Sequence, residues 1–134
     1  MPAPPPFRKE RLIPIDMPTF VTLKFGVDPA TLTVTSDGVV RYVMVAAHAS
    51  GASNAMYEGI RCSTGEFKTY ARVSASGLWS MVNDPQWRPL NDNNTSRHAL
   101  AFARLGACEG RSAAASDPAQ IIATLRNPLR NAGP

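Results

Sequence analysis

Asp37-Gly-Val-Val-Arg-Tyr42 and Tyr57-Glu-Gly-Ile-Arg-Cys62 decide the fold of this chain. Each stretch joins a turn or glycine signal to a strand pattern that carries a charged residue where burial is expected. Ser36-Asp37-Gly38 is a good hairpin turn, because Asp and Gly tolerate the positive φ that such turns require. The first stretch also opens the longest apolar run, residues 39–47, which we predict to be the central strand.

Other strand patterns surround this run. They cover residues 20–25, 31–35, 54–62 and 66–73, and a short one surrounds Trp79. The connections between them are short, and parallel strands would need longer crossovers. The pattern therefore predicts an antiparallel meander.

The last third of the chain changes to a helical pattern. Residues 96–105 have helical composition and end at Gly106, and Asp117 is a plausible N-cap with Pro118 at the first position of a second helix. We expect an α+β fold: an antiparallel meander sheet of about five to six strands with one or two C-terminal helices packed on it.

The 134-residue length suits one domain. Prolines gather near the ends, which predicts a proline-rich extended arm over residues 1–18, a single domain over residues 19–127 and a C-terminal tail over residues 128–134. Phe7 and Leu12 are apolar, so we expect part of the arm to lie across the domain.

Charge and hydropathy exclude several classes of function. The net charge is +4, but the basic residues are spread along the chain, and Glu10 interrupts the one dense group, which is Arg8, Lys9 and Arg11. A solvated positive surface is expected, and nucleic-acid binding is not, because no basic stripe is interleaved with aromatics. No apolar run is long enough to predict a transmembrane segment.

Two cysteines, Cys62 and Cys108, lie far apart in the sequence. Neither has the spacing of a zinc site, and no other motif indicates a metal or a cofactor. The two thiols either form a disulfide in an oxidising compartment or are unrelated buried thiols.

Five stretches carry a family resemblance. In this order they resemble the CNP1-like family of proteobacterial envelope proteins, over roughly residues 12–108: Asp28-Pro-Ala-Thr-Leu32, Asp37-Gly-Val-Val-Arg-Tyr42, Gly51-Ala-Ser-Asn54, Tyr57-Glu-Gly-Ile-Arg-Cys62 and Thr64-Gly-Glu-Phe-Lys-Thr-Tyr70. The resemblance implies an exported domain in the periplasm or cell envelope, with no established activity. A secretion signal or a lipid anchor is expected upstream of the numbered residues.

The strand register predicts a polar cluster. If residues 48–53 form a loop between antiparallel strands, Val43 lies opposite Glu58. The same reasoning through the turn at residues 63–65 places Glu58 opposite Tyr70. One face of the sheet would then carry a tentative binding site made of Arg41, Glu58, Lys68 and Tyr70.

This cluster has two interpretations. The first is a structural network in which Arg41 pairs with Glu58 and Tyr70 donates a hydrogen bond to Glu58, since buried ions need partners. The second is a site for a small anionic ligand. A register slip of one residue would change the face assignment.

Other chemical signals are weak. His48 and His98 flank expected loops, which favours a surface location for both imidazoles. Trp79 and Trp87 bracket a turn signal and are expected to close the end of the core. No serine lies in a nucleophile elbow, so no catalytic residue is assigned.

Three functions follow as hypotheses. The leading one is a non-enzymatic cell-envelope protein that acts through protein–protein contacts or self-association, with the proline-rich arm as docking element. The first alternative is a binding module for a small anionic ligand on the polar sheet face. The second alternative is a hydrolase, which lacks a recognisable nucleophile and base.

Overall fold

The computed structural model describes residues 2–73, 77–91 and 97–127 of the chain. The expected C-terminal tail, residues 128–134, lies outside the described residues.

Eight strands form one antiparallel sheet within the described residues. Its path runs β1-β2-β4-β5-β6-β7, while β3 pairs with β4 and β8 pairs with β6. This confirms the antiparallel meander and the α+β class. The strands are β1 Ile13–Ile15, β2 Lys24–Val27, β3 Thr33–Val34, β4 Val39–Ala47, β5 Ser53–Arg61, β6 Glu66–Val73, β7 Trp79–Met81 and β8 Arg88–Pro89.

The expected C-terminal helices also form. Helix α1, Arg97–Phe102, continues into a π-helical segment, η4, Ala103–Ala107. Helix α2, Pro118–Arg126, begins as expected, because the Asp117 side chain accepts a hydrogen bond from the Ala119 amide at 2.9 Å. None of the helices in the described ranges has the length and apolar character needed to cross a bilayer.

Several short elements complete the chain. Two 3₁₀ turns, η1 and η2, lie near the N-terminus, and a small ribbon of β9 and β10 follows the π-helical segment. Their bounds are η1 Lys9–Arg11, η2 Pro29–Thr31, β9 Cys108–Glu109 and β10 Ser112–Ala113.

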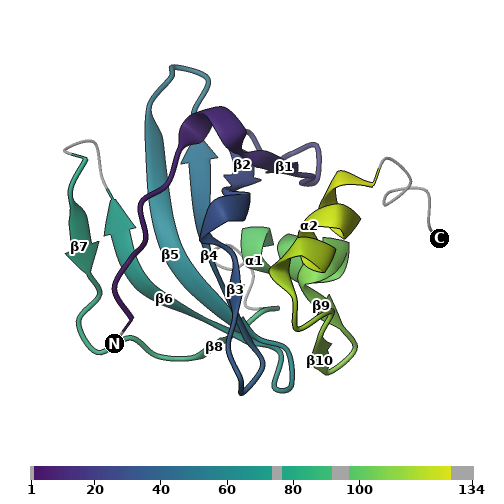
Figure 1. The fold of residues 1–134 in the computed structure, drawn as a ribbon. Coiled ribbons are helices and arrows are strands. Elements are labelled where there is room, and N and C mark those ends of the chain that lie inside the picture. Colours follow the sequence, from purple (N-terminus) through teal and green to yellow (C-terminus); the bar gives the residue numbers. More distant parts are fainter. Residues whose placement is uncertain (1, 74–76, 92–96, 128–134) are drawn as a thin grey trace.

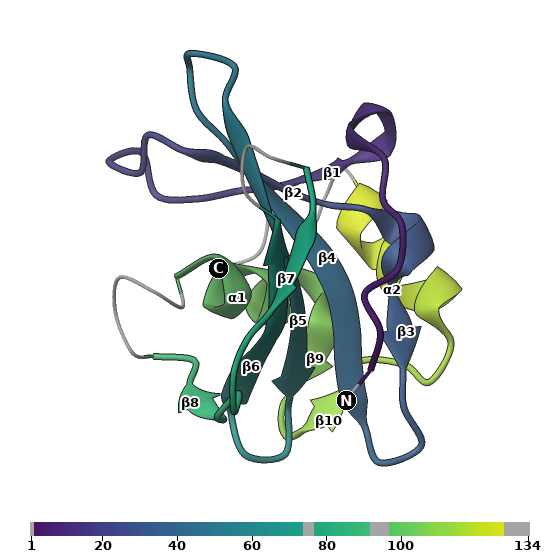
Figure 2. The ribbon, with the colours of Figure 1, turned by 90° about the vertical axis from the view of Figure 1, so that its left-hand side faces the viewer.

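The molecule has three layers, in which the helices cover one face of the sheet and the N-terminal arm crosses the other (Figures 1 and 2). Each face therefore has its own apolar core. The helix-side core includes Val40, Tyr42, Met44, Ile60, Phe67, Phe102, Ile121 and Leu125. The arm-side core includes Val43, Val45, Ala55, Tyr57, Tyr70, Ala71 and Val73, with Phe7, Leu12 and Trp79 packed against it.

The arm is held by apolar and polar contacts to its own domain. Phe7 packs edge-on against Trp79, with 5.7 Å between ring centroids. The Arg8 amide and the Arg11 guanidinium donate to the buried Asp28 carboxylate at 2.8 and 2.7 Å. The chain then enters β1, so the expected boundary at residue 18 falls between β1 and β2.

The strand expected over residues 20–25 is displaced. Strand β2 covers Lys24–Val27 instead, because the chain turns after Pro18, whose carbonyl accepts a hydrogen bond from the Val21 amide at 2.9 Å. Phe20 is 69% exposed and lies under the guanidinium of Arg97, 4.8 Å from its ring centroid.

The expected register between β4 and β5 is wrong by one residue. Tyr42, not Val43, lies opposite Glu58, and Arg41 lies opposite Gly59. The hairpin closes through a hydrogen bond from the His48 amide to the Ala52 carbonyl at 2.8 Å, which makes its loop one residue shorter than expected. A slip of one residue exchanges the two faces of a strand, so Glu58 and Arg41 lie on opposite faces.

A β-bulge changes the next pairing. Tyr57 lies opposite Ala71 but Glu58 lies opposite Thr69, so Tyr70 is the extra residue of β6. The Tyr70 carbonyl accepts a hydrogen bond from the Val82 amide at 2.9 Å. Arg61 pairs with Glu66, so the turn before β6 is one residue longer than expected, and the expected pairing of Glu58 with Tyr70 is wrong as well.

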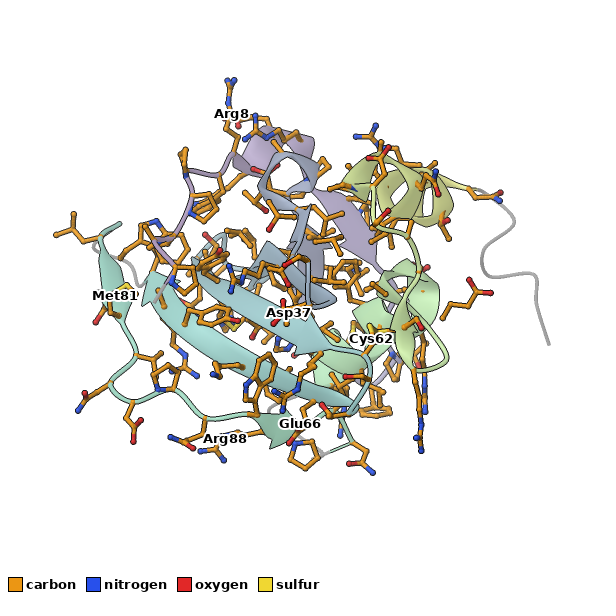
Figure 3. All side chains as sticks on the ribbon, turned by 60° about the horizontal axis from the view of Figure 1, so that its bottom comes forward. Arg8, Asp37, Cys62, Glu66, Met81 and Arg88 are labelled. Carbon is orange, nitrogen blue, oxygen red and sulfur yellow. A yellow bond between two sulfur atoms is a disulfide. The ribbon has the colours of Figure 1, made fainter. Side chains whose placement is uncertain are left out.

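Cys62 and Cys108 form a disulfide, with their Cα atoms 5.7 Å apart. It joins the end of β5 to the end of the π-helical segment, and Figure 3 shows Cys62 beside the helical layer. This confirms the disulfide alternative.

Candidate functional site

The candidate site lies on the arm-side face, where three strands place Arg41, Gly59 and Lys68 in one row. Gly59 has no side chain, and the Tyr70 hydroxyl lies 2.7 Å from the position that a Cβ atom on Gly59 would occupy. Tyr70 therefore fills the gap between the two cationic residues. Tyr70 follows Lys68 by two residues in β6, so both side chains lie on the same face, where Tyr70 packs in the arm-side core.

A cavity of about 430 Å³ opens beside this row. Side chains from β4, β5 and β6 line it together with the loop before β8 and the beginning of the arm. We call it the cationic pocket; its lining is Pro2, Asp37, Val39, Arg41, Arg61, Lys68, Tyr70, Pro85 and Trp87.

Arg41 is the residue of this pocket whose hydrogen bonding is incomplete. Its Nε atom is buried and has no hydrogen-bond partner within the described residues. Its guanidinium carbon lies 5.5 Å from the centroid of the Tyr70 ring, which gives the charge an aromatic contact but no acceptor. A buried N–H without an acceptor is costly, so an acceptor atom in the pocket would be stabilised.

Two further cations meet at Trp87. The guanidinium carbon of Arg61 lies 4.2 Å from the Trp87 ring centroid, and the Lys68 ammonium lies 4.7 Å from it. Arg61 is also paired with Glu66 at 2.6 Å, and this hydrogen bond lowers the pKa of the Glu66 carboxyl. Lys68 has no carboxylate within ion-pair distance in the described part of the chain, so its charge is available to the pocket.

One carboxylate, that of Asp37, lines the same pocket. It accepts a short hydrogen bond from the Thr35 hydroxyl, which lowers the pKa of Asp37. Figure 3 labels Asp37 in the turn that leads into β4. Arg61 is already paired with Glu66, but Arg41 and Lys68 still outnumber this carboxylate, so the pocket favours an anion.

Glu58 lies on the helix-side face, in a separate cluster. The Tyr42 hydroxyl donates to Glu58 Oε1 at 3.0 Å, and His98 Nε2 lies 2.9 Å from both carboxylate oxygens. The Thr69 hydroxyl approaches Oε2 at 3.5 Å. Glu58 is 1% exposed and His98 6% exposed. We call these four residues the Glu58 cluster.

The cluster couples helix α1 to the sheet through charge. Burial alone would lower the pKa of His98, but the adjacent Glu58 charge and its hydrogen bond outweigh burial, and the net pKa is raised. Burial and the same carboxylate raise the pKa of Tyr42 well above its ordinary value, so its hydroxyl remains a donor. Phe25 stacks on the His98 ring, with centroids 5.1 Å apart.

The structure thus brings together three of the four expected site residues, Arg41, Lys68 and Tyr70, and separates them from Glu58. The expected Arg41–Glu58 pair and the hydrogen bond from Tyr70 to Glu58 are wrong, because the observed registers of β4, β5 and β6 place these groups on opposite faces.

His98 is buried, not at the surface as the sequence suggested. The signal that could have shown this is the helical spacing of α1, which puts His98 on the same face as the apolar residues Ala99 and Phe102, and all three are buried.

Trp87 departs from its expected role. It lies against two cations in the loop before β8, whereas Trp79 packs on the arm-side core as expected. No spacing in the sequence joins Trp87 to Arg61 or Lys68.

A metal site is not formed by the described residues. Within residues 2–73, 77–91 and 97–127, no three His, Cys, Asp or Glu side chains lie close enough together to share a metal ion. Arg41, Lys68 and Tyr70 are suited to an anionic group and not to a cation.

Comparison with known proteins gives a family match. The model of the CNP1-like family matches residues 1–126, which include every residue of the cationic pocket and of the Glu58 cluster. No curated protein and no solved structure matched the chain. Since the family match spans nearly the whole sequence, the chain belongs to the CNP1-like family.

Proposed function

We propose that this domain is a non-enzymatic module of the cell envelope that binds an anionic ligand in the cationic pocket. The observation that carries the proposal is the buried Arg41 Nε atom, which has no hydrogen-bond partner among the described residues and belongs to a side chain that lines a cavity with two more cations. Phosphate and carboxylate oxygens are the acceptors that guanidinium groups bind best.

The lining supports binding without chemistry. The nine described lining residues include no serine, cysteine or histidine. Tyr70 and Trp87 supply aromatic surface, while Arg41, Arg61 and Lys68 supply charge. Such a wall suits a ligand that has an apolar or aromatic body and an anionic group.

The disulfide supports a location in the cell envelope. Cys62–Cys108 is a stable cross-link only where thiols are oxidised, as in the bacterial periplasm. Export to that compartment is therefore part of the proposal.

The leading expectation from the sequence was docking through the proline-rich arm, whereas this proposal places recognition in the cationic pocket. The described polar contacts of Arg8 and Arg11 and the ring contact of Phe7 are made with the chain's own sheet, so we assign recognition to the pocket. A protein partner or self-association through the arm stays a prediction.

The test is a binding titration at low salt with phenyl phosphate, inorganic phosphate and benzoate. Trp87 lies under two pocket cations, so its fluorescence should change on binding. We expect saturable binding, and a loss of at least about tenfold in affinity in Arg41→Gln and Lys68→Gln, since one charge-assisted hydrogen bond is worth about 1.5–3 kcal/mol.

Arg126→Gln is the matched control, because Arg126 is an exposed cation in the last turn of α2 and does not line the cationic pocket. Its affinity for the anions should equal that of the unmodified protein. The absence of saturable binding by all three probes, or affinities that ignore the Arg41 and Lys68 substitutions, would contradict the proposed function.

A further inference from the structure

The helix-side face contains a second cavity, of about 360 Å³, at the edge of the sheet where β6 meets the loop between β7 and β8. We call it the Glu58 pocket. Pro85 lines both this cavity and the cationic pocket, but the other lining residues differ. They are Met56, Glu58, Phe67, Thr69, Arg72, Val82, Asn83, Asp84, Gln86 and Arg88.

A buried carboxylate forms part of the wall of this pocket. Glu58 Oε1 accepts a hydrogen bond from the Tyr42 hydroxyl and lies 2.9 Å from His98 Nε2. Glu58 Oε2 lies at the same distance from His98 Nε2, and its contact with the Thr69 hydroxyl is long, at 3.5 Å. A carboxylate offers about four acceptor sites, so Oε2 retains the capacity for another donor. A hydroxyl or ammonium group in the cavity would supply it.

Two arginines add the opposite charge. Arg72 and Arg88 are exposed and line the same cavity, and neither has a carboxylate within ion-pair distance in the described ranges. Figure 3 shows Arg88 near the edge of the molecule. Guanidinium groups bind carboxylates in a planar, two-bonded geometry, which makes these residues suitable for the anionic end of a ligand.

The remaining lining fits a small polar ligand. Asn83 adds an amide, while the Gln86 amide donates to the Asp84 carbonyl at 3.2 Å and holds the loop in shape. Met56 and Phe67 give the cavity an apolar side. Small-molecule sites typically combine such an apolar wall with a few convergent polar groups.

We propose that the Glu58 pocket binds a small organic acid that also carries a hydroxyl or an ammonium group. The protic group donates to Glu58 Oε2, and the carboxylate of the ligand binds Arg72 and Arg88. This site uses different side chains from the cationic pocket and does not depend on the proposed function of that pocket.

Isothermal titration of the full chain tests the assignment with four probes: D-glucuronate, L-alanine, D-glucose and acetate. Glucuronate carries hydroxyls and a carboxylate, alanine carries an ammonium and a carboxylate, and the last two each lack one of the required groups. We expect glucuronate or alanine to bind at least about tenfold more tightly than both glucose and acetate. Binding of glucuronate would identify a hydroxyl as the group that donates to Glu58 Oε2, and binding of alanine would identify an ammonium group.

Variants locate the site. Arg72→Gln and Arg88→Gln change exposed side chains, so the fold should be kept, and each should weaken binding of the acid by about tenfold. Arg126→Gln is the matched control, because Arg126 is an exposed cation on α2 that lines neither pocket, and it should leave the affinity unchanged. Thr69→Val should weaken binding to a smaller extent.

Three results would overturn the proposal. They are no binding of either donor-bearing acid, equal binding of acetate or glucose, and an affinity that Arg72→Gln and Arg88→Gln do not alter. An affinity lowered only by Arg41→Gln would place the acid in the cationic pocket instead.

Discussion

At the scale of single residues, the main finding is that Glu58 is a structural anion on the helix-side face. It is buried beneath α1, and Tyr42 and His98 satisfy most of its hydrogen-bonding capacity. A buried carboxylate without partners would cost several kcal/mol, so His98 holds the helix in place as well as balancing the charge.

The raised pKa of His98 predicts the pH dependence of stability. Its folded-state pKa lies above the unfolded value of 6.5, so the folded protein binds the proton more tightly. The stabilisation is complete below pH 6.5 and is lost as the pH rises through the folded-state pKa. Urea unfolding measured between pH 5.5 and 9 should show this decline.

His98→Ala should remove the decline and lower the free energy of unfolding by about 3 kcal/mol at pH 6, since it leaves Glu58 without its charged partner. His48→Ala is the control, because His48 is exposed, and it should change the unfolding free energy by less than about 0.5 kcal/mol. An unchanged pH profile in His98→Ala would contradict this role.

At the scale of elements, the arm and the register of β6 determine the two pockets. The pairing of Glu58 with Thr69 puts Thr69 beside Glu58 on the helix-side face, and alternation puts Tyr70 on the arm-side face. The arm contributes Pro2 to the cationic pocket and is anchored farther along the chain at Asp28. Burial opposes ionisation of Asp28, but the hydrogen bonds from Arg11, Arg8 and Ala30 outweigh it and lower its pKa.

Loss of the Arg11 anchor should release the arm locally. In Arg11→Met, the hydrogen bond at 2.7 Å to Asp28 is absent, and the Arg8 amide, which shares that carboxylate, should exchange with deuterium about tenfold faster. Hydrogen exchange followed by NMR measures this amide directly.

Arg126→Met provides the comparison, because Arg126 is an exposed cation in the last turn of α2, away from Asp28. It should leave the exchange of the Arg8 amide as it is in the unmodified protein. Equal exchange rates for this amide in Arg11→Met and Arg126→Met would show that Asp28 does not anchor the arm through Arg11.

At the scale of the whole molecule, the sheet separates two apolar cores and two pockets. A single disulfide links the sheet to the helical layer that lies on one side of it (Figures 1 and 3). Cys62 and Cys108 are 46 positions apart, so the cross-link closes a loop that contains β6, β7, β8 and α1. The bond therefore restricts the unfolded chain strongly.

Removal of this cross-link should destabilise the domain. The double variant Cys62→Ser/Cys108→Ser should lose about 2–5 kcal/mol of unfolding free energy in urea, the range observed when small domains lose a native disulfide. Reductant should lower the stability of the unmodified protein to about that of the variant. A reductant effect of similar size on the double variant would contradict the explanation, because the variant has no disulfide to reduce.

Much of the fold could be predicted from the sequence because its signals are local. The apolar run of β4, the Asp37-Gly38 turn and the Asp117-Pro118 helix start each depend on neighbouring residues, and each forms as expected. Strand β6 likewise begins and ends where its alternation predicts. The family resemblance is similarly carried by short stretches in a fixed order.

The candidate site could be predicted only in part. Arg41, Lys68 and Tyr70 lie on one face of the sheet as expected, but Trp87 joins them in a cavity through a loop that no sequence period places there. The expected register between β4 and β5 was wrong by one residue, so it placed Glu58 on the wrong face of the sheet. Strand side chains alternate between the two faces, and a slip of one residue exchanges them.

The sequence by itself determined the α+β class, the order of the strands and helices, and the two cysteines able to form a cross-link. The tertiary structure alone decided which polar groups meet: Glu58 with His98, and Arg41 with Lys68 and Tyr70. The physical reason is that the class follows from local backbone preferences and apolar periodicity. Contacts between charged groups instead depend on the lengths of the two hairpin loops and on the burial of both faces together.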